Sequence, residues 1–137
     1  MIRPIMTKQF FLRQPSETAV AADLSIAHDL ADTLAANLSR CIGMAANMIG
    51  ERKRIIAFVD DDGEINVMIN PEITSAENEY LAEEGCLSLP GRREAKRFKR
   101  IELRWQDEEM QLRSGSFEGW VAQVIQHEID HCNGVLI

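Results

Sequence analysis

The chain has 137 residues, of which 45% are hydrophobic and 27% charged, and it carries a formal net charge of −7. These values exclude a disordered chain and predict that residues 1–137 form a single globular domain. The opening residues lack a signal peptide's apolar stretch and no segment is long enough to cross a membrane, so we expect a cytoplasmic protein with no membrane partner. The acidic balance argues against nucleic-acid binding by the whole surface, and no specific DNA binding is expected.

The first half of the chain contains one helical pattern and one hairpin pattern. Leucines and alanines recur at helical spacing in residues 19–39, which predicts an amphipathic helix with Ser16 as a candidate N-terminal cap. Two apolar, β-branched runs at residues 54–59 and 65–69 flank an Asp-Asp-Gly turn and predict a hairpin. We expect Pro71 to end the second strand, because proline cannot donate a ladder hydrogen bond.

The second half adds a strand and a helix. Ile101, Leu103 and Trp105 alternate with polar residues, which predicts a half-buried strand. Residues 117–133 predict a helix that stops at the following Gly134. Together these elements predict an α+β fold in which antiparallel β-sheets pack around the C-terminal helix, with another helix near the N-terminus.

One segment is strongly basic although the chain as a whole is acidic. Residues 92–100 contain six basic side chains among nine residues. A run of this kind is usually a solvated face of a strand or loop, and the alternative is a local docking patch for a polyanion.

The most specific chemical signal is the H-E-x-x-H pattern His127-Glu128-Ile129-Asp130-His131. Two histidines four residues apart lie on one helical face, so both imidazoles can reach one metal ion. Trp120 and Val124 fall in the same stripe of the helical wheel. Glu128 falls in the apolar sector beside this stripe, where a carboxylate would be desolvated as general bases are, so we interpret it as catalytic.

A catalytic metal site of this kind usually has three protein ligands and one open position. Because only residues 132–137 follow the motif, we expect the third ligand upstream. Cys132 points about 100° away from the preceding histidine, which favours core packing. His28 is expected to be a partly exposed helix residue, which leaves Cys41 and Cys86 as candidates.

Three segments, in order along the chain, closely resemble the signature motifs of peptide deformylases. They are Gly43-Met44-Ala45-Ala46-Asn47, Glu84-Gly85-Cys86-Leu87-Ser88-Leu89-Pro90 and the H-E-x-x-H segment. Peptide deformylases remove the formyl group from the N-terminal formyl-methionine of nascent chains. The resemblance implies that Cys86, His127 and His131 bind one divalent metal, typically Fe²⁺ in this family, with Zn²⁺, Ni²⁺ or Co²⁺ as substitutes.

The resemblance also implies a mechanism. Metal-activated water would attack the formyl carbon, and Glu128 would accept the water's proton and pass it to the leaving amine. The backbone N–H of Leu87 would point at the developing oxyanion. The implied partner is a formylated peptide or nascent chain, with a transient ribosome contact.

Substrate contacts are implied in the same way. Backbone groups of Ile42, Gly43 and Gly85 would lie beside the substrate peptide, a close approach that glycine permits. Trp120 and Val124 would help to line the methionine pocket, and ordinary core packing is the alternative for both.

The chain departs from the family's first motif, G-x-G-x-A-A-x-Q, at two positions. Cys41 replaces the first glycine and Met48 replaces the glutamine. In the family the glutamine amide donates a hydrogen bond to the oxyanion, which a thioether cannot do. Losing one such donor typically costs about 10²–10³ in rate, so we expect a weaker or redirected hydrolase. Cys41 is interpreted as packing, with oxidation together with Cys86 as the alternative.

Two other functions compete with deformylation. One is a catalytically weakened paralogue that binds formylated peptides or metal, which Met48 favours and Glu128 opposes, because a pure binder does not need a buried base. The other is an H-E-x-x-H endopeptidase, which the cysteine ligand and the short segment after the motif make the weaker hypothesis.

Overall fold

A computed structural model describes all of residues 1–137 and confirms the predicted α+β fold. A single antiparallel sheet has the order β1-β2-β3-β4-β5. Its strands are β1 (Gly43–Ala45), β2 (Ile55–Val59), β3 (Ile65–Cys86), β4 (Leu89–Gln106) and β5 (Leu112–Glu118). The helices are α1 (Gln9–Leu12), α2 (Leu24–Ala36) and α3 (Gly119–Cys132), with short 3₁₀ turns η1 (Ala21–Asp23) and η2 (Ala46–Ile49). None of the helices has the length and apolar character needed to cross a membrane.

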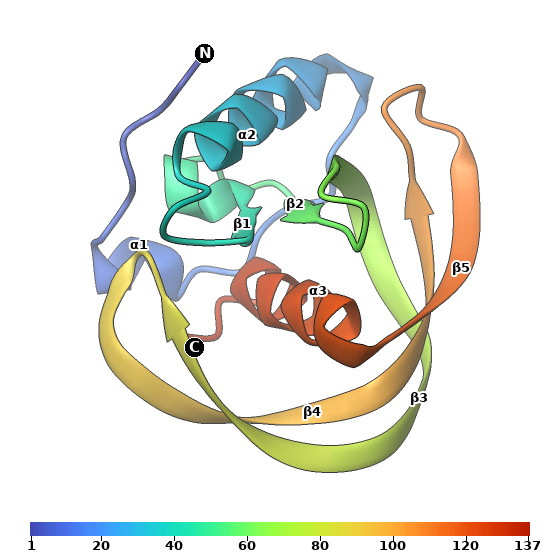
Figure 1. Cartoon of the computed structure of the whole chain (residues 1–137). Coiled ribbons are helices and arrows are strands. Elements are labelled where there is room, and N and C mark those ends of the chain that lie inside the picture. The colour runs from blue at the N-terminus through green and yellow to red at the C-terminus, as the bar shows by residue number, and fades with distance from the viewer.

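Strand β2 separates two hydrophobic cores. Its side chains alternate between the two faces of the sheet, as the pleat requires. Ile55 and Ala57 pack in the core with α2, whereas Ile56 and Phe58 pack in the core with α3. The two short strands β1 and β2 therefore lie between the two helices, and the long β3–β4 ribbon curves around α3 (Figure 1).

Helix α3 is enclosed on more than its apolar face. Gln126 is a polar residue, yet its side chain is buried. Its amide exchanges two hydrogen bonds of 2.8 Å with the backbone of Phe98 on β4. The helix stops where predicted, because Gly134 has a φ of +77°, which the left-handed C-terminal position requires.

The start of the first long helix was predicted wrongly. Helix α2 begins at Leu24, not at residue 19, and Ser16 does not cap it. The N–H of Ser16 donates instead to the carbonyl of Cys132 (2.8 Å). Ala19 is bonded through its N–H to Asn70 Oδ1 (2.8 Å), so this segment is tied to β3 before the helix starts.

Pro71 does not end its strand, contrary to the prediction. Strand β3 continues to Cys86, and its register with β4 is irregular between Ile69 and Glu72. The proline lies in that irregularity, where its missing N–H does not remove a regular ladder bond. Asn70 beside it has a positive φ of 53° and bonds to Ala19 through its side chain. The ribbon therefore bends at this point instead of stopping, and its far end reaches α3.

Candidate active site

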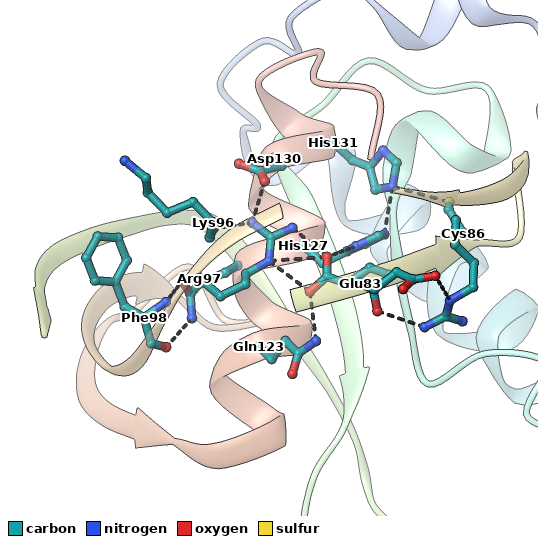
Figure 2. A network of polar contacts seen from close by, with 12 residues as sticks. Glu83, Cys86, Lys96, Arg97, Phe98, Gln123, His127, Asp130 and His131 are labelled. Atoms are coloured by element: carbon teal, nitrogen blue, oxygen red, sulfur yellow. Dashed lines mark hydrogen bonds and ion pairs between the residues drawn. The ribbon is translucent and has the colours of Figure 1, made fainter. Parts of the chain in front are cut away.

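Three ligand atoms converge where the end of β3 meets α3. The Nε2 atoms of His127 and His131 lie 3.1 Å apart, and Cys86 Sγ lies 3.3 Å from Nε2 of His131. All three ligand atoms lie within 4.8 Å of one another (Figure 2). Three electron-pair donors that face one another suit a shared cation, and one thiolate with two imidazoles is a set that divalent transition metals accept.

The other sequence candidates lie outside this group. His28 is exposed on α2, and Cys132 is completely buried in the core beside α3, as expected. Cys41 is half-buried and lines the adjacent cleft. Burial, with a smaller contribution from the charge of Glu128, raises the pKa of its thiol to about 11. Cys41 is therefore protonated at neutral pH, which favours its interpretation as a packing residue.

Glu84 orients one of the two histidines. Its Oε1 lies 2.8 Å from Nδ1 of His127, which leaves Nε2 of that ring directed at Cys86 and His131. A carboxylate behind a histidine in this way fixes the tautomer and the ring plane. Sequence reasoning assigned Glu84 no role, although it opens the second motif.

A buried ion pair holds Glu84 in turn. Arg97 Nη2 donates to Glu84 Oε1 (2.7 Å) and its Nε donates to Oε2 (3.0 Å), while Gln123 Nε2 donates to Oε2 (2.8 Å). The second carboxylate on Arg97 is that of Asp130, 2.7 Å from Nη1 (Figure 2). Burial alone would raise the pKa of Glu84, but the hydrogen bonds from His127, Arg97 and Gln123 outweigh it and lower that pKa to about 2.

Arg97 belongs to the basic run that sequence analysis singled out. Its side chain is 4% exposed, whereas four of its five basic neighbours in the run are exposed. Two of those neighbours pair with acidic residues of β3, Lys96 with Glu79 (3.0 Å) and Arg92 with Glu83 (3.2 Å). Much of the run is thus neutralised within the ribbon, which weakens the polyanion-patch hypothesis.

Glu128 lies beside the converging ligands and is 3% exposed. Its Oε1 has no hydrogen-bond partner, and burial, opposed by the charge of His127, raises its pKa to about 7. Gly43 on β1 makes room for this carboxylate, since a Cβ there would lie 2.8 Å from Glu128 Oε2 and 2.6 Å from Val124 Cγ1. A carboxylate poised near neutrality is suited to moving a proton at pH 7.

A cleft of about 660 Å³ opens in front of these groups. The residues that the sequence predicted beside the substrate all line it: Ile42, Gly43, Gly85, Leu87, Trp120 and Val124. Trp120 is 44% exposed, whereas Val124 is half-buried and also packs against the core beside α3.

Met48 also lines the cleft but is only 1% exposed, because the rest of its side chain packs into the core beside α2. It lies on η2, and the neighbouring Asn47 donates from Nδ2 to the carbonyl of His131 (2.9 Å). Asn47 therefore ties the first motif to α3, a role that sequence reasoning missed.

The α+β fold and its H-E-x-x-H helix are those of a metal-dependent hydrolase. The sequence model of the family described as polypeptide deformylase matches residues 3–137, and the chain belongs to this family, as its motifs predicted.

Comparisons with individual sequences and solved structures agree with this family assignment. The chain is 47% identical to the peptide deformylase of Clostridium beijerinckii over the full length of both, and 40% identical to that of Thermoanaerobacter pseudethanolicus over 82% of this chain and 70% of the relative. Its fold matches the crystal structure of peptide deformylase from Thermotoga maritima with a TM-score of 0.88 at 30% identity, covering 99% of this chain and 95% of that one. It also matches the Met-Ala-Ser-bound class I type b enzyme of Acinetobacter baumannii, with a TM-score of 0.87, 26% identity and coverage of 99% and 97%.

We predict that replacing either Cys86 or His131 by Ala abolishes tight binding of a divalent metal, because each removes one of three converging donors. Cys41→Ala, which removes the other thiol of the cleft, and Cys132→Ala should both retain one metal per chain. Metal analysis of the purified proteins checks this. Full occupancy in Cys86→Ala would rule out the ligand assignment.

We predict that Arg97→Met lowers the free energy of unfolding by about 3–5 kcal/mol, since it leaves the Glu84 carboxylate buried without its main partner. Lys96→Met on the same strand breaks only an exposed pair and should cost at most about 1 kcal/mol. Urea denaturation of the metal-free proteins measures both. Equal losses for the two variants would contradict the buried-pair argument.

Proposed function

We propose that this chain is a metal-dependent peptide deformylase that hydrolyses the N-terminal formyl group of formyl-methionyl peptides. The observation that carries the proposal is the convergence of Cys86, His127 and His131 beside the buried Glu128, at the base of a cleft. The relatives that match over the full chain are peptide deformylases. Because α3 packs against β1, β2 and β4 around this cleft, residues 1–137 would work as one domain.

Cys86, His127 and His131 would hold the metal. The mixed sulfur and nitrogen donors are compatible with Fe²⁺, which we propose as the ion in cells, and with Zn²⁺, Ni²⁺ or Co²⁺. A divalent ion held there acts as a Lewis acid that makes water nucleophilic near neutral pH. Glu84 would keep the ring of His127 in the ligand orientation through its hydrogen bond to Nδ1.

Glu128 would move the proton. Its free Oε1 can accept a proton from the attacking water, and burial, which raises its pKa, favours holding that proton until it passes to the amine that leaves. The N–H of Leu87, which lines the cleft next to Cys86, would donate to the oxygen on which negative charge develops.

The substrate backbone would bind as an added strand. Strand β1 is at the edge of the sheet, and Ile42 and Gly43 line the cleft along that edge. Gly85 lies on another wall of the same cleft, and Trp120 and Val124 would contact the methionine side chain. Main-chain pairing of this type accepts many sequences, as a processing enzyme for nascent chains requires. The homologue from Acinetobacter baumannii has been solved with the peptide Met-Ala-Ser bound.

The enzyme would act in the cytoplasm on formylated nascent chains, and it would contact the ribosome transiently. The weakened-paralogue alternative is not favoured, because Glu128 lies buried beside the ligand group at the cleft. Timed release of formate from formyl-Met-Ala-Ser by metal-loaded protein tests the proposal, and full occupancy without formate release would overturn it.

We predict that Glu128→Gln keeps its metal but loses about 10²–10⁴ in kcat, because an amide cannot accept the proton. In the wild type the base acts only when ionised, so kcat/KM should fall as the pH drops through its pKa. A nearby cation favours the carboxylate, so this fall should lie below pH 7. The residual activity of the variant should not show it, and a pH–rate profile of both proteins, matched for metal, checks this. If Glu128→Gln turned over at the wild-type rate, the carboxylate would have no role in catalysis.

We predict that Met48→Gln raises kcat on a formyl-methionyl peptide and changes KM less. An amide bonds a tetrahedral oxyanion more strongly than the ground-state carbonyl, and only that difference accelerates the chemistry. The gain should fall short of about 10²–10³, because the surrounding core is packed around a thioether. Steady-state kinetics at equal metal content decide the matter. An unchanged or lower kcat would mean that the missing donor does not limit the enzyme.

A further inference from the structure

Two exposed arginines, Arg40 and Arg92, line the cleft. Arg92 forms an ion pair and Arg40 does not. Arg92 Nε lies 3.2 Å from Glu83 Oε1, and its Nη2 donates to the carbonyl of the same residue (2.7 Å). Arg40 makes no ion pair, and its Nη2 donates only to Asn37 Oδ1, a neutral amide oxygen at 2.6 Å. The outer cleft therefore carries one uncompensated positive charge, although the whole chain has a net charge of −7.

The guanidinium of Arg40 is held in place. Asn37, which accepts its hydrogen bond, is buried and donates from Nδ2 to the carbonyl of Thr33 (2.7 Å) on α2. Arginine has five N–H donors, so those not bonded to Asn37 are free for a ligand. An anchored cation with free donors is preorganised for a carboxylate.

The direction of the cleft sets which part of a substrate would pass Arg40. Beyond Gly43 the strand β1 enters the core, because Met44 and Ala45 are fully buried. A peptide paired with this edge, with its formyl group beside Glu128, therefore leads out along Ile42 toward Arg40. Arg40 lies in the turn at residues 37–40, three positions before Gly43, so the two residues are at most about 10 Å apart, the length of three extended residues. That distance corresponds to the third or fourth residue of the substrate.

We propose that Arg40 is a specificity-determining residue that favours formylated substrates with an acidic side chain at their third or fourth residue. This inference rests on the proposed deformylase function. Among the acidic residues at the cleft, Glu83 is paired with Arg92 and Glu84 is bonded to Arg97. Glu128 is buried at the base of the cleft beside the histidines. The interaction is exposed, so its effect is moderate and sensitive to salt.

The test compares kcat/KM for paired peptides, formyl-Met-Ala-Glu-Ser-amide against formyl-Met-Ala-Gln-Ser-amide, and the same pair with the variable residue fourth. For the wild type at low ionic strength the Glu/Gln ratio should reach about three to five at one of the two positions, and it should decline in 0.5 M salt. In Arg40→Gln the ratio should approach one, and in Arg40→Glu it should fall below one. Each ratio comes from one enzyme preparation, so incomplete folding or metal loading cancels.

Lys99→Gln is the matched control, because Lys99 is exposed, lies outside the cleft and carries the same charge, and it should leave the ratio unchanged. A wild-type ratio near one, or a ratio that survives in Arg40→Gln, would overturn the inference, as would a ratio lost only in Arg92→Gln.

Peptides with free and amidated C-termini separate the effect of the acidic side chain from that of a terminal carboxylate. A preference for the free terminus alone would also overturn the inference. Formate release from formyl-Met-Ala-Ser tests the deformylase activity separately. Calorimetric binding of Met-Ala-Glu-Ser-amide and its Gln counterpart reads the same preference without turnover.

Discussion

The candidate site depends on one buried carboxylate. Glu84 lies near the end of β3, accepts hydrogen bonds from Arg97 of the paired strand and Gln123 of α3, and contacts His127 on the same helix. A buried carboxylate stays ionised only if all its hydrogen-bond donors are in place. Because these donors come from both β4 and α3, they fix the position of the β3–β4 ribbon relative to the helix. The proposed ligand Cys86 follows Glu84 by two positions, so the pairing that satisfies the carboxylate also brings the thiol to the histidines.

The irregularity near Pro71 serves the same geometry. A flat, regular hairpin would carry its far end away from the rest of the fold, whereas bulges increase twist and let a ribbon curve. Register shifts after Ile69 and Ile73 accompany the bend of β3 and β4 around α3 (Figure 1). A proline that reads as a strand end in isolation is accommodated here, because both its neighbours and the partner strand are already out of regular register.

What could be predicted from the sequence was the chemistry that is local to one element. The spacing of His127 and His131, and the position of Glu128 in the apolar sector, follow from helical geometry alone. The role of Glu84 could not be predicted in the same way, because its partners come from another strand and a helix. Strand alternation with the buried Ile101 places Arg97 on the inward face, but it places the exposed Lys99 there too, so the sequence pattern does not single out Arg97. Resemblance to a family selected Cys86 over Cys41, a choice that residue spacing left open.

Met48 shows how a departure from a family motif can be structurally neutral and still bear on the chemistry. Its side chain packs in the core with α2, and an apolar side chain is well suited to that buried position. At the wall of the cleft, however, a thioether offers no N–H, and the proposed oxyanion would depend on the Leu87 N–H and the cation alone. Gly43 still lets β1 lie close to Glu128, the proposed base. The substitution thus keeps a buried side chain in the first motif but removes the N–H that the resemblance assigns to the oxyanion.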